Sequence, residues 1–478
     1  MRRAKIVATL GPALDDPDRL RAAIDAGIDV VRLNFSHGTR DEHASRLALV
    51  HEIAHDLGRL VGSLGDLQGP KIRLGQLPEE GIDLVDGGEA ILISGVEALT
   101  EYEQDGVPCL PVVYEHLAKD VEPGAMILID DGLLRLVVAE IDAERVRTRV
   151  VAGGHATSRK GVNLPGVQVT ATSLTDKDRE DVRSMVDIGV DWIALSFVRR
   201  PEDVVELRDL VQSFGGVQPI VSKLERPEAL DNLEGIVAVT DAVMVARGDL
   251  GVEIGPERVP AIQKEMIDLA NRECRPVITA TEMLESMVRN SRPTRAEASD
   301  VANAIFDGSD AVMLSGETAS GRYPVEVVRT MARIIEVAET SSHRIRPVSP
   351  TTEGIVGRVV AKAAKQIADD AAATTILVFS LSGASVQLVS KFRPNQPVIG
   401  LTTDERSLHR FALMWGTAGQ LVPMEDHSQD LIRAAEDICL EHGYGAVGDT
   451  VVIVSGIPGG RGGTNRVLVH RIGDLNAA

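Results

Sequence analysis

Two carboxylates and a lysine stand close together in the segment 220–253, and these residue types together can hold a metal ion beside an anion. The segment contains two short apolar runs, of which the first ends in Lys223 and Glu225 and the second in Asp249. Because the residues between the runs have helical spacing, the segment predicts a strand, a helix and a second strand, with both carboxylates at neighbouring strand ends. Paired oxygen ligands suit Mg²⁺, and the lysine suits a phosphate or a developing enolate. An ordinary surface salt bridge explains the trio equally well.

Other expected strand ends in the first 340 residues carry further polar side chains. Arg32 and Arg73 add two cations, and hydroxyls come from Ser36, Thr281 and Ser315. Three cations around a dicarboxylate metal site suit an anionic substrate with more than one charged group, such as a phosphorylated carboxylic acid. Phosphoryl transfer is therefore the leading reaction class, since a metal and cations stabilise charge on the transferring group. There is no Walker-type glycine-lysine loop, so a nucleotide would be held by scattered residues.

Two loops have the composition of anion-binding sites. Residues 247–251 form a glycine-containing turn whose backbone N–H groups can hold a carboxylate, unless it is a plain tight turn. Residues 380–385 join an expected strand to an expected helix, where hydroxyls and N–H groups can cradle a phosphate or simply cap the helix. The glycine-rich loop 456–465 carries Arg461, which can face this loop. A lone histidine, His37, is more typical of a structural residue.

Strand and helix patterns alternate through most of the first 340 residues. The short apolar strand patterns lie at 5–10, 28–35, 60–64, 190–197, 220–221, 242–246, 276–281 and 310–315. Eight such units predict an α/β fold, a (β/α)₈ TIM barrel, whose active sites lie at the carboxyl ends of the strands, where the polar residues stand. A doubly wound open sheet is the structural alternative.

The alternation is interrupted once, and a separate unit follows it. Residues 70–165 are rich in short alternating segments and turns, which predicts a small β-barrel domain inserted between two parts of the main barrel, 1–69 and 166–340. The segment 341–354 is rich in Ser, Pro and Thr and is typical of a linker. Residues 341–478 as a whole predict a C-terminal α/β open-sheet domain.

Composition excludes several classes of function. The 478 residues carry a formal net charge of −21, which argues against a general binder of nucleic acid or anionic membranes. Only three cysteines occur, and their wide spacing fits neither a disulfide framework nor a metal site and indicates a reducing cytosol. The first apolar run is too short for a signal peptide, and no stretch approaches membrane-spanning length.

With these residues assembled, the chain closely resembles the pyruvate kinase family along essentially its whole length. The motifs that carry the resemblance are KIVATLGP, VRLNFSHG, GDLQGPKIRLG, RKGVNLPG, VSKLERPEAL, VMVARGDLGVE, ITATEMLESM, PTRAEASDVANA and DAVMLSGETA, in this order. The resemblance implies transfer of a phosphoryl group from phosphoenolpyruvate to ADP, giving pyruvate and ATP at the last step of glycolysis. It also implies that the inserted domain closes as a lid, that the C-terminal domain is regulatory, and that the enzyme is a cytoplasmic homotetramer.

The resemblance assigns barrel residues to the metal and the substrate. Glu225 and Asp249 match the Mg²⁺ ligands, a site that also accepts Mn²⁺, and Lys223 stabilises the transferring phosphoryl group and the enolate. Thr281 lies near the carbon that is protonated, through water. The implied catalytic residues are Lys223, Arg32 and Thr281, and the implied substrate contacts are Arg32, Lys223, Gly248, Asp249, Thr281 and Ser315.

The resemblance also implies sites for the nucleotide and for a monovalent cation. The matching nucleotide positions are Asn34, Phe35, Ser36, His37, Arg73 and Lys160. Many members bind K⁺ at positions matching Asn34, Ser36, Asp66 and the Leu67 carbonyl, and carry a glutamate where this chain has Lys71. Because a lysine ammonium can occupy the place of a monovalent cation, we expect Lys71 to replace K⁺ and the enzyme to work without it. A solvated lysine with K⁺ bound as usual is the alternative.

The loop 380–385 matches the effector loop of the family, with residues Ser380, Leu381, Ser382, Gly383, Ala384 and Ser385. Ala384 stands where a basic residue is common. The tryptophan and arginine that help to bind fructose 1,6-bisphosphate in some relatives have no evident counterpart around 424–433. We therefore expect an effector with one phosphate, such as a sugar monophosphate or AMP, rather than the bisphosphate.

Two other functions compete with a kinase. A metal-dependent barrel lyase or aldolase acting on pyruvate enolate would use the same carboxylate pair, but it does not explain the inserted domain, Arg73 or Lys160. A non-catalytic sugar-phosphate sensor with a decayed barrel would lack Lys223, Glu225 or Asp249, and all three are present.

Overall fold

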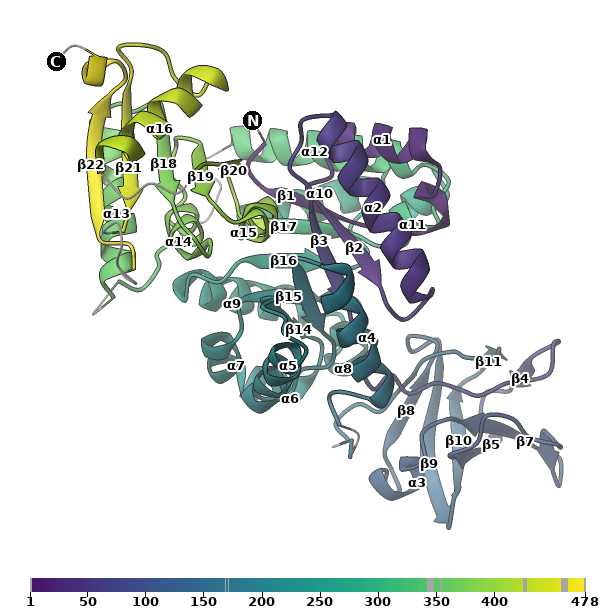
Figure 1. Cartoon of the computed structure of the whole chain (residues 1–478). Coiled ribbons are helices and arrows are strands. Elements are labelled where there is room, and N and C mark those ends of the chain that lie inside the picture. The colour runs from purple at the N-terminus through teal and green to yellow at the C-terminus, as the bar shows by residue number, and fades with distance from the viewer. Residues whose placement is uncertain are drawn as a thin grey trace.

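A closed eight-stranded parallel barrel occupies the middle of the structure, with a smaller domain on either side of it (Figure 1). The structure is a computed structural model that describes residues 2–167, 169–170, 172–341, 348–352, 355–423, 428–456 and 463–476. The barrel strands are β1 (Lys5–Thr9), β2 (Val30–Asn34), β3 (Gly62–Asp66), β13 (Trp192–Leu195), β14 (Ile220–Leu224), β15 (Ala242–Ala246), β16 (Val277–Ala280) and β17 (Ala311–Leu314). They pair in this order, and β17 closes the ring on β1. The closed barrel confirms the expected fold class and excludes the open sheet.

Helices surround the barrel and bury their apolar faces against the outside of the strands. The longer ones are α1 (Pro17–Ala26), α2 (Arg40–Asp56), α4 (Asp176–Ile188), α5 (Pro201–Ser213), α9 (Val259–Arg272), α10 (Arg295–Phe306) and α12 (Pro324–Thr340), and α11 (Gly316–Ala319) is a single turn. Thr39, Thr175 and Thr294 begin three of these helices with capping boxes. Each box satisfies backbone N–H groups that a helix start otherwise leaves unpaired.

The segment 220–253 is more helical than its pattern indicates. Lys223 lies within β14 rather than after it, and the residues behind form two helices, α6 (Pro227–Asp231) and α7 (Leu233–Val239), instead of one. The expected turn at 247–251 is wrong, because these residues begin helix α8 (Arg247–Ile254) directly after β15. The first turn of this helix presents N–H groups without helical acceptors, which is the property the turn was expected to supply.

The inserted domain is a curled β structure with its own hydrophobic core. Its main sheet has the order β12 (Val162–Asn163), β8 (Met126–Ile129), β9 (Leu134–Asp142), β10 (Arg145–Ala152), β5 (Glu89–Ser94), β7 (Val107–Val112) and β6 (Glu103–Gln104). A second sheet pairs β4 (Ile82–Leu84) with β11 (Gly154–Ala156), and α3 (Leu117–Asp120) is a short helix. Leu74 N–H donates to the Lys160 carbonyl at 2.8 Å, and Val113 N–H donates to the Arg73 carbonyl at 3.1 Å. The segment around 73–74 therefore links the two sides of the main sheet, as in a barrel.

The C-terminal domain is a five-stranded sheet between helices. The sheet has the order β20 (Thr417–Leu421), β19 (Val398–Thr402), β18 (Thr375–Phe379), β21 (Thr450–Ser455) and β22 (Arg466–Arg471), of which only β22 runs antiparallel. Its helices are α13 (Val356–Asp370), α14 (Ala384–Lys391), α15 (Glu405–Arg410) and α16 (Ser428–Glu441). Most of the expected linker 341–354 and Arg461 lie outside the described residues, as does part of 424–433. The precise boundaries of the three domains stay predictions.

The C-terminal domain covers the end of the barrel at which the strands begin. Lys5 Nζ, at the start of β1, donates to the Thr417 carbonyl at 2.8 Å. Ala412 and Leu413 share a hydrophobic cluster with side chains from the barrel interior. The inserted domain lies near the opposite end of the barrel, where the strands end (Figure 1).

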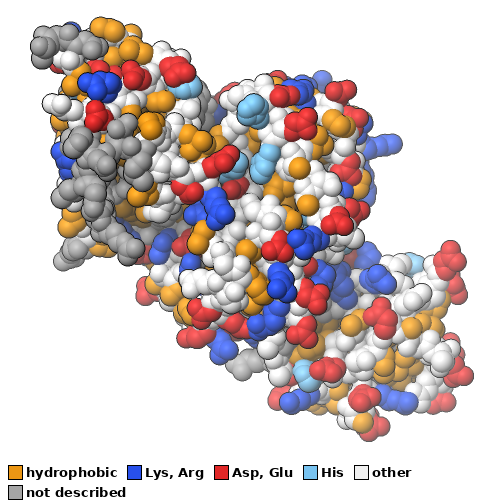
Figure 2. All heavy atoms as spheres, in the orientation of Figure 1, with side chains coloured by type: hydrophobic (Ala, Val, Ile, Leu, Met, Phe, Trp, Pro, Cys, Tyr) orange, Lys and Arg blue, Asp and Glu red, His pale blue; other side chains and the backbone are white. Residues whose placement is uncertain are grey.

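The surface carries mixed charge. Figure 2 shows acidic and basic side chains interspersed over all three domains on the face that it draws. Among the described residues, no helix combines the length and the apolar character needed to cross a membrane.

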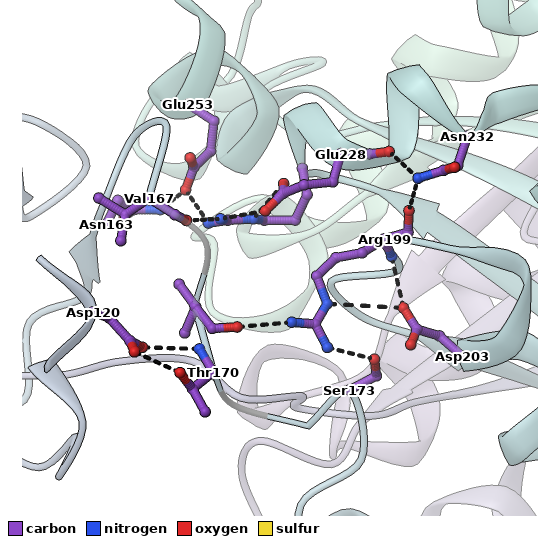
Figure 3. A network of polar contacts seen from close by, with 12 residues as sticks. Asp120, Asn163, Val167, Thr170, Ser173, Arg199, Asp203, Glu228, Asn232 and Glu253 are labelled. Carbon is purple, nitrogen blue, oxygen red and sulfur yellow. Dashed lines mark hydrogen bonds and ion pairs between the residues drawn. The ribbon is translucent and has the colours of Figure 1, made fainter.

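Two arginines of the barrel hold the segment through which the chain returns from the inserted domain (Figure 3). Arg199 Nη1 donates to the Val169 carbonyl at 3.0 Å, and Arg226 Nη2 donates to the Val167 carbonyl at 3.2 Å. Arg226 also pairs with Glu253 at 2.7 Å. Since Arg226 directly follows Glu225 in the chain, the attachment of the inserted domain and the candidate metal ligand share one stretch of backbone.

Replacing Arg226 by methionine tests how firmly this attachment is held. Burial raises the pKa of Glu253 although Arg226 opposes the shift, so the carboxylate depends on its partner. Breaking a buried pair on one side costs about 3–5 kcal/mol, because the other charge is left uncompensated. We expect Arg226→Met to lower the urea midpoint of unfolding, and Arg226→Met/Glu253→Leu to recover much of the loss. A single variant as stable as the parent would contradict this.

Candidate active site

The candidate residues from the barrel meet in one cavity at the carboxyl ends of the strands. The cavity has a volume of about 660 Å³. Of the residues expected from the sequence, its walls include Arg32, Asn34, His37, Asp66, Lys223, Glu225, Asp249, Thr281 and Ser315. Gly248 and Lys71 line an adjoining cavity of about 1070 Å³, which shares Asp249, Thr281 and Ser315 with the first. Residues from six different strand ends are thus brought together, as expected for this barrel type.

A chain of alternating charges runs through the floor of the cavity. Arg32 Nε lies 2.6 Å from Asp66 Oδ2, Lys223 Nζ lies 3.3 Å from Asp66 Oδ1, and Lys223 Nζ lies 2.9 Å from Glu225 Oε1. The side chains of Asp66 and Glu225 are each 1% exposed. Burial alone would lower the pKa of Lys223, but Asp66 and Glu225 outweigh it and raise the pKa. Lys223 is therefore a fixed cation at neutral pH.

The two carboxylates expected to hold a metal fit that role. Burial raises the pKa of Glu225, and the negative charge of Asp249 raises it further against the opposing effect of Lys223. Glu225 Oε2 accepts a hydrogen bond from Phe197 N–H at 2.9 Å, which fixes the orientation of the carboxylate. A buried carboxylate whose charge is disfavoured by burial and by a neighbouring carboxylate provides a place for a divalent cation. Among the described residues, no cluster of three or more His, Cys, Asp or Glu offers a competing site.

Thr281 is held in a strained conformation beside the first turn of α8. Its φ is +71°, which is unusual for a β-branched residue. Its hydroxyl accepts a hydrogen bond from Gly248 N–H at 2.7 Å and donates to the Ala280 carbonyl at 2.6 Å. Arg247 supports the same turn through the Thr281 carbonyl at 2.7 Å and pairs with Asp300 at 2.7 Å. Sequence reasoning included Arg247 only as part of a turn, and its supporting role was missed.

Ser196 is a second residue that sequence reasoning missed. Its hydroxyl accepts a hydrogen bond from Lys223 Nζ at 2.7 Å and donates to the Leu67 carbonyl at 2.7 Å. It therefore completes the contacts of the central lysine. Its place at the end of the strand pattern 190–197 was the available signal.

The expected nucleotide residues lie in two places. Asn34 ends β2, and Phe35, Ser36 and His37 follow it. Asn34 and His37 line the cavity, and Phe35 stacks on His43 with ring centroids 4.3 Å apart. Arg73 and Lys160 lie in the inserted domain, where Lys160 pairs with Asp130 at 2.9 Å and Arg73 donates to the Arg159 carbonyl at 3.1 Å. Neither of the two is among the described residues that line the two cavities.

Lys71 contacts the metal side of the site. Its ammonium lies 3.3 Å from Asp249 Oδ1, whereas Asp66 is contacted by Arg32 and Lys223. The Asn34 amide oxygen accepts a hydrogen bond from Ser36 N–H at 3.2 Å. The replacement of K⁺ by Lys71 stays a prediction, because the contact in the structure joins Lys71 to the expected Mg²⁺ ligand Asp249 and not to the residues expected to hold K⁺.

The candidate effector loop joins β18 to α14, as expected. Ser385 N–H donates to the Ser380 hydroxyl at 3.4 Å, and the Ser385 hydroxyl lies 2.5 Å from that of Thr464. Gly383 adopts a φ of +84°, where a glycine is favoured. Leu381, Ser382 and Ala384 complete the loop, whose role in binding a phosphate stays a prediction.

Comparison with known proteins finds similar proteins along almost the whole length of the chain. Residues 1–328 match the model of the pyruvate kinase barrel domain, and residues 358–470 match that of the pyruvate kinase alpha/beta domain. A pyruvate kinase of Mycobacterium tuberculosis is 44% identical over 99% of both chains. One from Geobacillus stearothermophilus is 44% identical over 100% of this chain and 81% of its own. The crystal structure of a pyruvate kinase from Cryptosporidium parvum is similar with a TM-score of 0.89 and 35% identity, covering 98% of this chain and 96% of the other.

These matches cover both the barrel that carries the cavity and the C-terminal domain behind it. The chain therefore belongs to the pyruvate kinase family, whose members use a divalent metal to transfer the phosphoryl group of phosphoenolpyruvate to ADP, giving pyruvate and ATP.

Proposed function

We propose that this chain performs phosphoryl transfer in the cavity at the carboxyl ends of its barrel strands, with Lys223 as the cation at the reacting group. The observation that carries the proposal is the buried chain of charges from Arg32 through Asp66 and Lys223 to Glu225. It presents two cations to an anionic substrate while one buried acid fixes both of them. Preorganised charges of this kind stabilise a transition state without reorganising during the reaction.

The substrate is held at its two charged ends. Arg32 contacts the phosphate, and the backbone of Gly248 and Asp249, together with Thr281, holds the carboxylate. The N-terminal end of α8 suits an anion, and the Gly248 N–H there donates to the Thr281 hydroxyl at 2.7 Å. Ser315, which lines both cavities, completes the substrate contacts.

The reaction breaks the bond between phosphorus and the enol oxygen and forms one between phosphorus and an oxygen of ADP. Lys223 stabilises negative charge on the phosphoryl group and on the enolate that is left. Because its pKa is raised, Lys223 keeps its proton at neutral pH and acts through charge. The enolate carbon then takes a proton from a water molecule beside Thr281, which yields pyruvate.

Glu225 and Asp249 would hold the divalent metal, for which we propose Mg²⁺, with Mn²⁺ able to replace it. When bound, the ion acts as a Lewis acid toward the oxygens of the substrate. Burial raises the pKa of Glu225 and the charge of Asp249 adds to the shift, which supports placing a cation between these two carboxylates.

ADP binds between the barrel and the inserted domain in this proposal. Asn34, Phe35, Ser36 and His37 contact it from the barrel, and Arg73 and Lys160 approach it when the inserted domain closes as a lid. In the part of the chain that the structure describes, neither Arg73 nor Lys160 lines the two cavities, which supports a closing movement that brings them to ADP.

Further parts of the proposal concern the surroundings of the site. Lys71 replaces K⁺, and a phosphorylated effector, a sugar monophosphate or AMP rather than fructose 1,6-bisphosphate, binds at 380–385. The enzyme is a cytoplasmic homotetramer that binds neither nucleic acid nor membranes. The free, buried state of Cys109, Cys274 and Cys439 supports a reducing compartment.

Lys223→Met tests the central assignment. The variant removes the cation that stabilises the transferring group, so kcat should fall by at least about 10²–10³-fold. ADP-dependent release of pyruvate from phosphoenolpyruvate measures it. Lys365→Met, which removes a lysine paired with Asp369 in the C-terminal domain, should keep full activity. Full activity in Lys223→Met, with an unchanged thermal midpoint, would refute the role.

Independence from K⁺ is tested in buffer free of sodium and potassium. Because the Lys71 ammonium already supplies positive charge next to Asp249, the parent enzyme should be equally active with and without KCl. Lys71→Met should lose activity and regain part of it when KCl is added. Strong activation of the parent enzyme by KCl would contradict independence from K⁺.

The preference for one phosphate is tested by titrating effectors against substrate saturation. Fructose 6-phosphate and AMP should lower the phosphoenolpyruvate concentration at half-saturation more than fructose 1,6-bisphosphate does. The reason is the uncharged Ala384, which cannot neutralise a second phosphate. Equal or stronger activation by the bisphosphate would refute the preference.

A further inference from the structure

An ion pair joins the two elements that carry the expected metal ligands. Arg226 Nη1 lies 2.7 Å from Glu253 Oε1, and the two side chains are 9% and 1% exposed. Arg226 directly follows Glu225, just beyond β14, and Glu253 lies on α8, four residues after Asp249. Since four residues are about one helical turn, Asp249 and Glu253 lie on the same side of α8. The pair therefore links the backbone next to one ligand with the helix that carries the other.

Strand pairing ends before it reaches the two ligands. The paired residues of β14 and β15 end with Leu224 and Val245. Glu225 follows the last paired residue of β14, and Asp249 lies in the first turn of α8. The sheet therefore fixes the two strands, whereas the spacing of the carboxylates beyond the strand ends depends on other contacts. The ion pair supplies such a contact at this point.

Further contacts hold both members of the pair in place. Arg226 Nη2 donates to the Glu228 carboxylate and to the Val167 carbonyl, each at 3.2 Å. Glu253 Oε1 also accepts a hydrogen bond from Asn163 Nδ2 at 3.3 Å, which comes from the inserted domain. The other oxygen of Glu253, Oε2, is buried and has no hydrogen-bond partner among the described residues. Arg226 is therefore the cation that fixes this carboxylate, and with it the end of α8.

The hydrogen-bond donor that orients Glu225 lies at the same place. Phe197 N–H donates to Glu225 Oε2 at 2.9 Å, and the φ of Phe197 is +55°, a conformation that persists only where the surroundings hold it. Phe197 lines a small cavity of about 40 Å³ together with Asn163, Arg226 and Glu253. Loss of the ion pair would therefore also loosen the packing around the residue that orients Glu225.

We propose that Arg226 and Glu253 are positioning residues, which set the spacing of the two metal ligands and thereby favour a small divalent cation. Contacts behind the ligands of a metal site orient the ligands and tune the affinity for the ion. Mg²⁺ requires nearly ideal octahedral geometry with short bonds, whereas Ca²⁺ accepts longer bonds in a flexible arrangement. A fixed spacing therefore discriminates against Ca²⁺, and a loose spacing does not. This role rests on the proposed metal-binding function of Glu225 and Asp249.

Binding of Mn²⁺ to the full-length protein without substrate tests this role, and the electron paramagnetic resonance signal of free Mn²⁺ measures it. Arg226→Met/Glu253→Leu removes both members of the buried pair, so that neither is left as an unpaired charge. This variant should bind Mn²⁺ about 10-fold to 100-fold more weakly than the parent. Arg226→Lys keeps a cation opposite Glu253 and should bind with intermediate affinity. Arg333→Met/Glu326→Leu, which removes an ion pair from the surface of α12, should bind like the parent.

Displacement of bound Mn²⁺ by Mg²⁺ or by Ca²⁺ gives a readout that a loss of stability alone does not change. In Arg226→Met/Glu253→Leu, the affinity for Mg²⁺ should fall more than the affinity for Ca²⁺, because a loose spacing still suits the larger ion. A thermal midpoint near that of the parent would show that the fold is retained. If the double variant does not fold, Arg226→Lys should show the same change in selectivity on a smaller scale. Parent-like affinity in both variants, or an equal loss of affinity for Mg²⁺ and Ca²⁺, would overturn the positioning role.

Glu225→Gln separates the positioning role from the assignment of the metal site. The variant changes an expected ligand, so it should lose most of its Mn²⁺ binding. If it binds Mn²⁺ like the parent, the proposed metal site falls, and the positioning role falls with it. If it loses binding while Arg226→Met/Glu253→Leu binds like the parent, the metal site stands and only the positioning role falls.

Discussion

The catalytic end of the molecule depends on one buried acid that holds two cations apart. Asp66 lies between Arg32 and Lys223, and both of its oxygens are used to position positive charge. Burial would raise the pKa of Asp66, but Lys223 and Arg32 outweigh it and lower the pKa, so the acid stays ionised. A buried ion chain is weak evidence for stability, since desolvation offsets much of the attraction. Its value here is geometric, because it holds two cations at the cavity in which we propose that the phosphoryl group is transferred.

The other end of the barrel is organised by acids in a different way. An aspartate directly precedes every second strand and accepts a hydrogen bond from the backbone N–H of the first or second residue of the preceding barrel strand. The four pairs are Asp29 with Ile6, Asp191 with Ser63, Asp241 with Ile220 and Asp310 with Val277, at 2.7 to 2.8 Å. The C-terminal domain attaches to this ring through Lys391, which lies 2.7 Å from Asp310 Oδ2. These acids therefore tie neighbouring strands together, and one of them, Asp310, also anchors the C-terminal domain.

The sequence was sufficient for the barrel and for most of the catalytic cavity. Eight apolar runs ending in polar residues predict both the strand count and the face on which Lys223, Glu225 and Asp249 meet. The repeated aspartates before strands, as in Gly-Ile-Asp-Val and Gly-Val-Asp-Trp, were visible in the sequence but were not used. Helix α8 was mistaken for a turn because its first residues, Arg247 and Gly248, have the composition of a turn, while its helical hydrogen bonds depend on tertiary context.

Contacts between segments that lie far apart in the sequence could not be predicted from local sequence patterns. Lys71 and Asp249 are 178 residues apart, and their meeting depends on how the inserted domain leaves the barrel. Arg275 belongs to the barrel and Arg410 to the C-terminal domain, and only the packing of the two domains brings both residues to one cavity. In both cases the two residues meet because folded domains pack against each other, which a local sequence pattern does not describe.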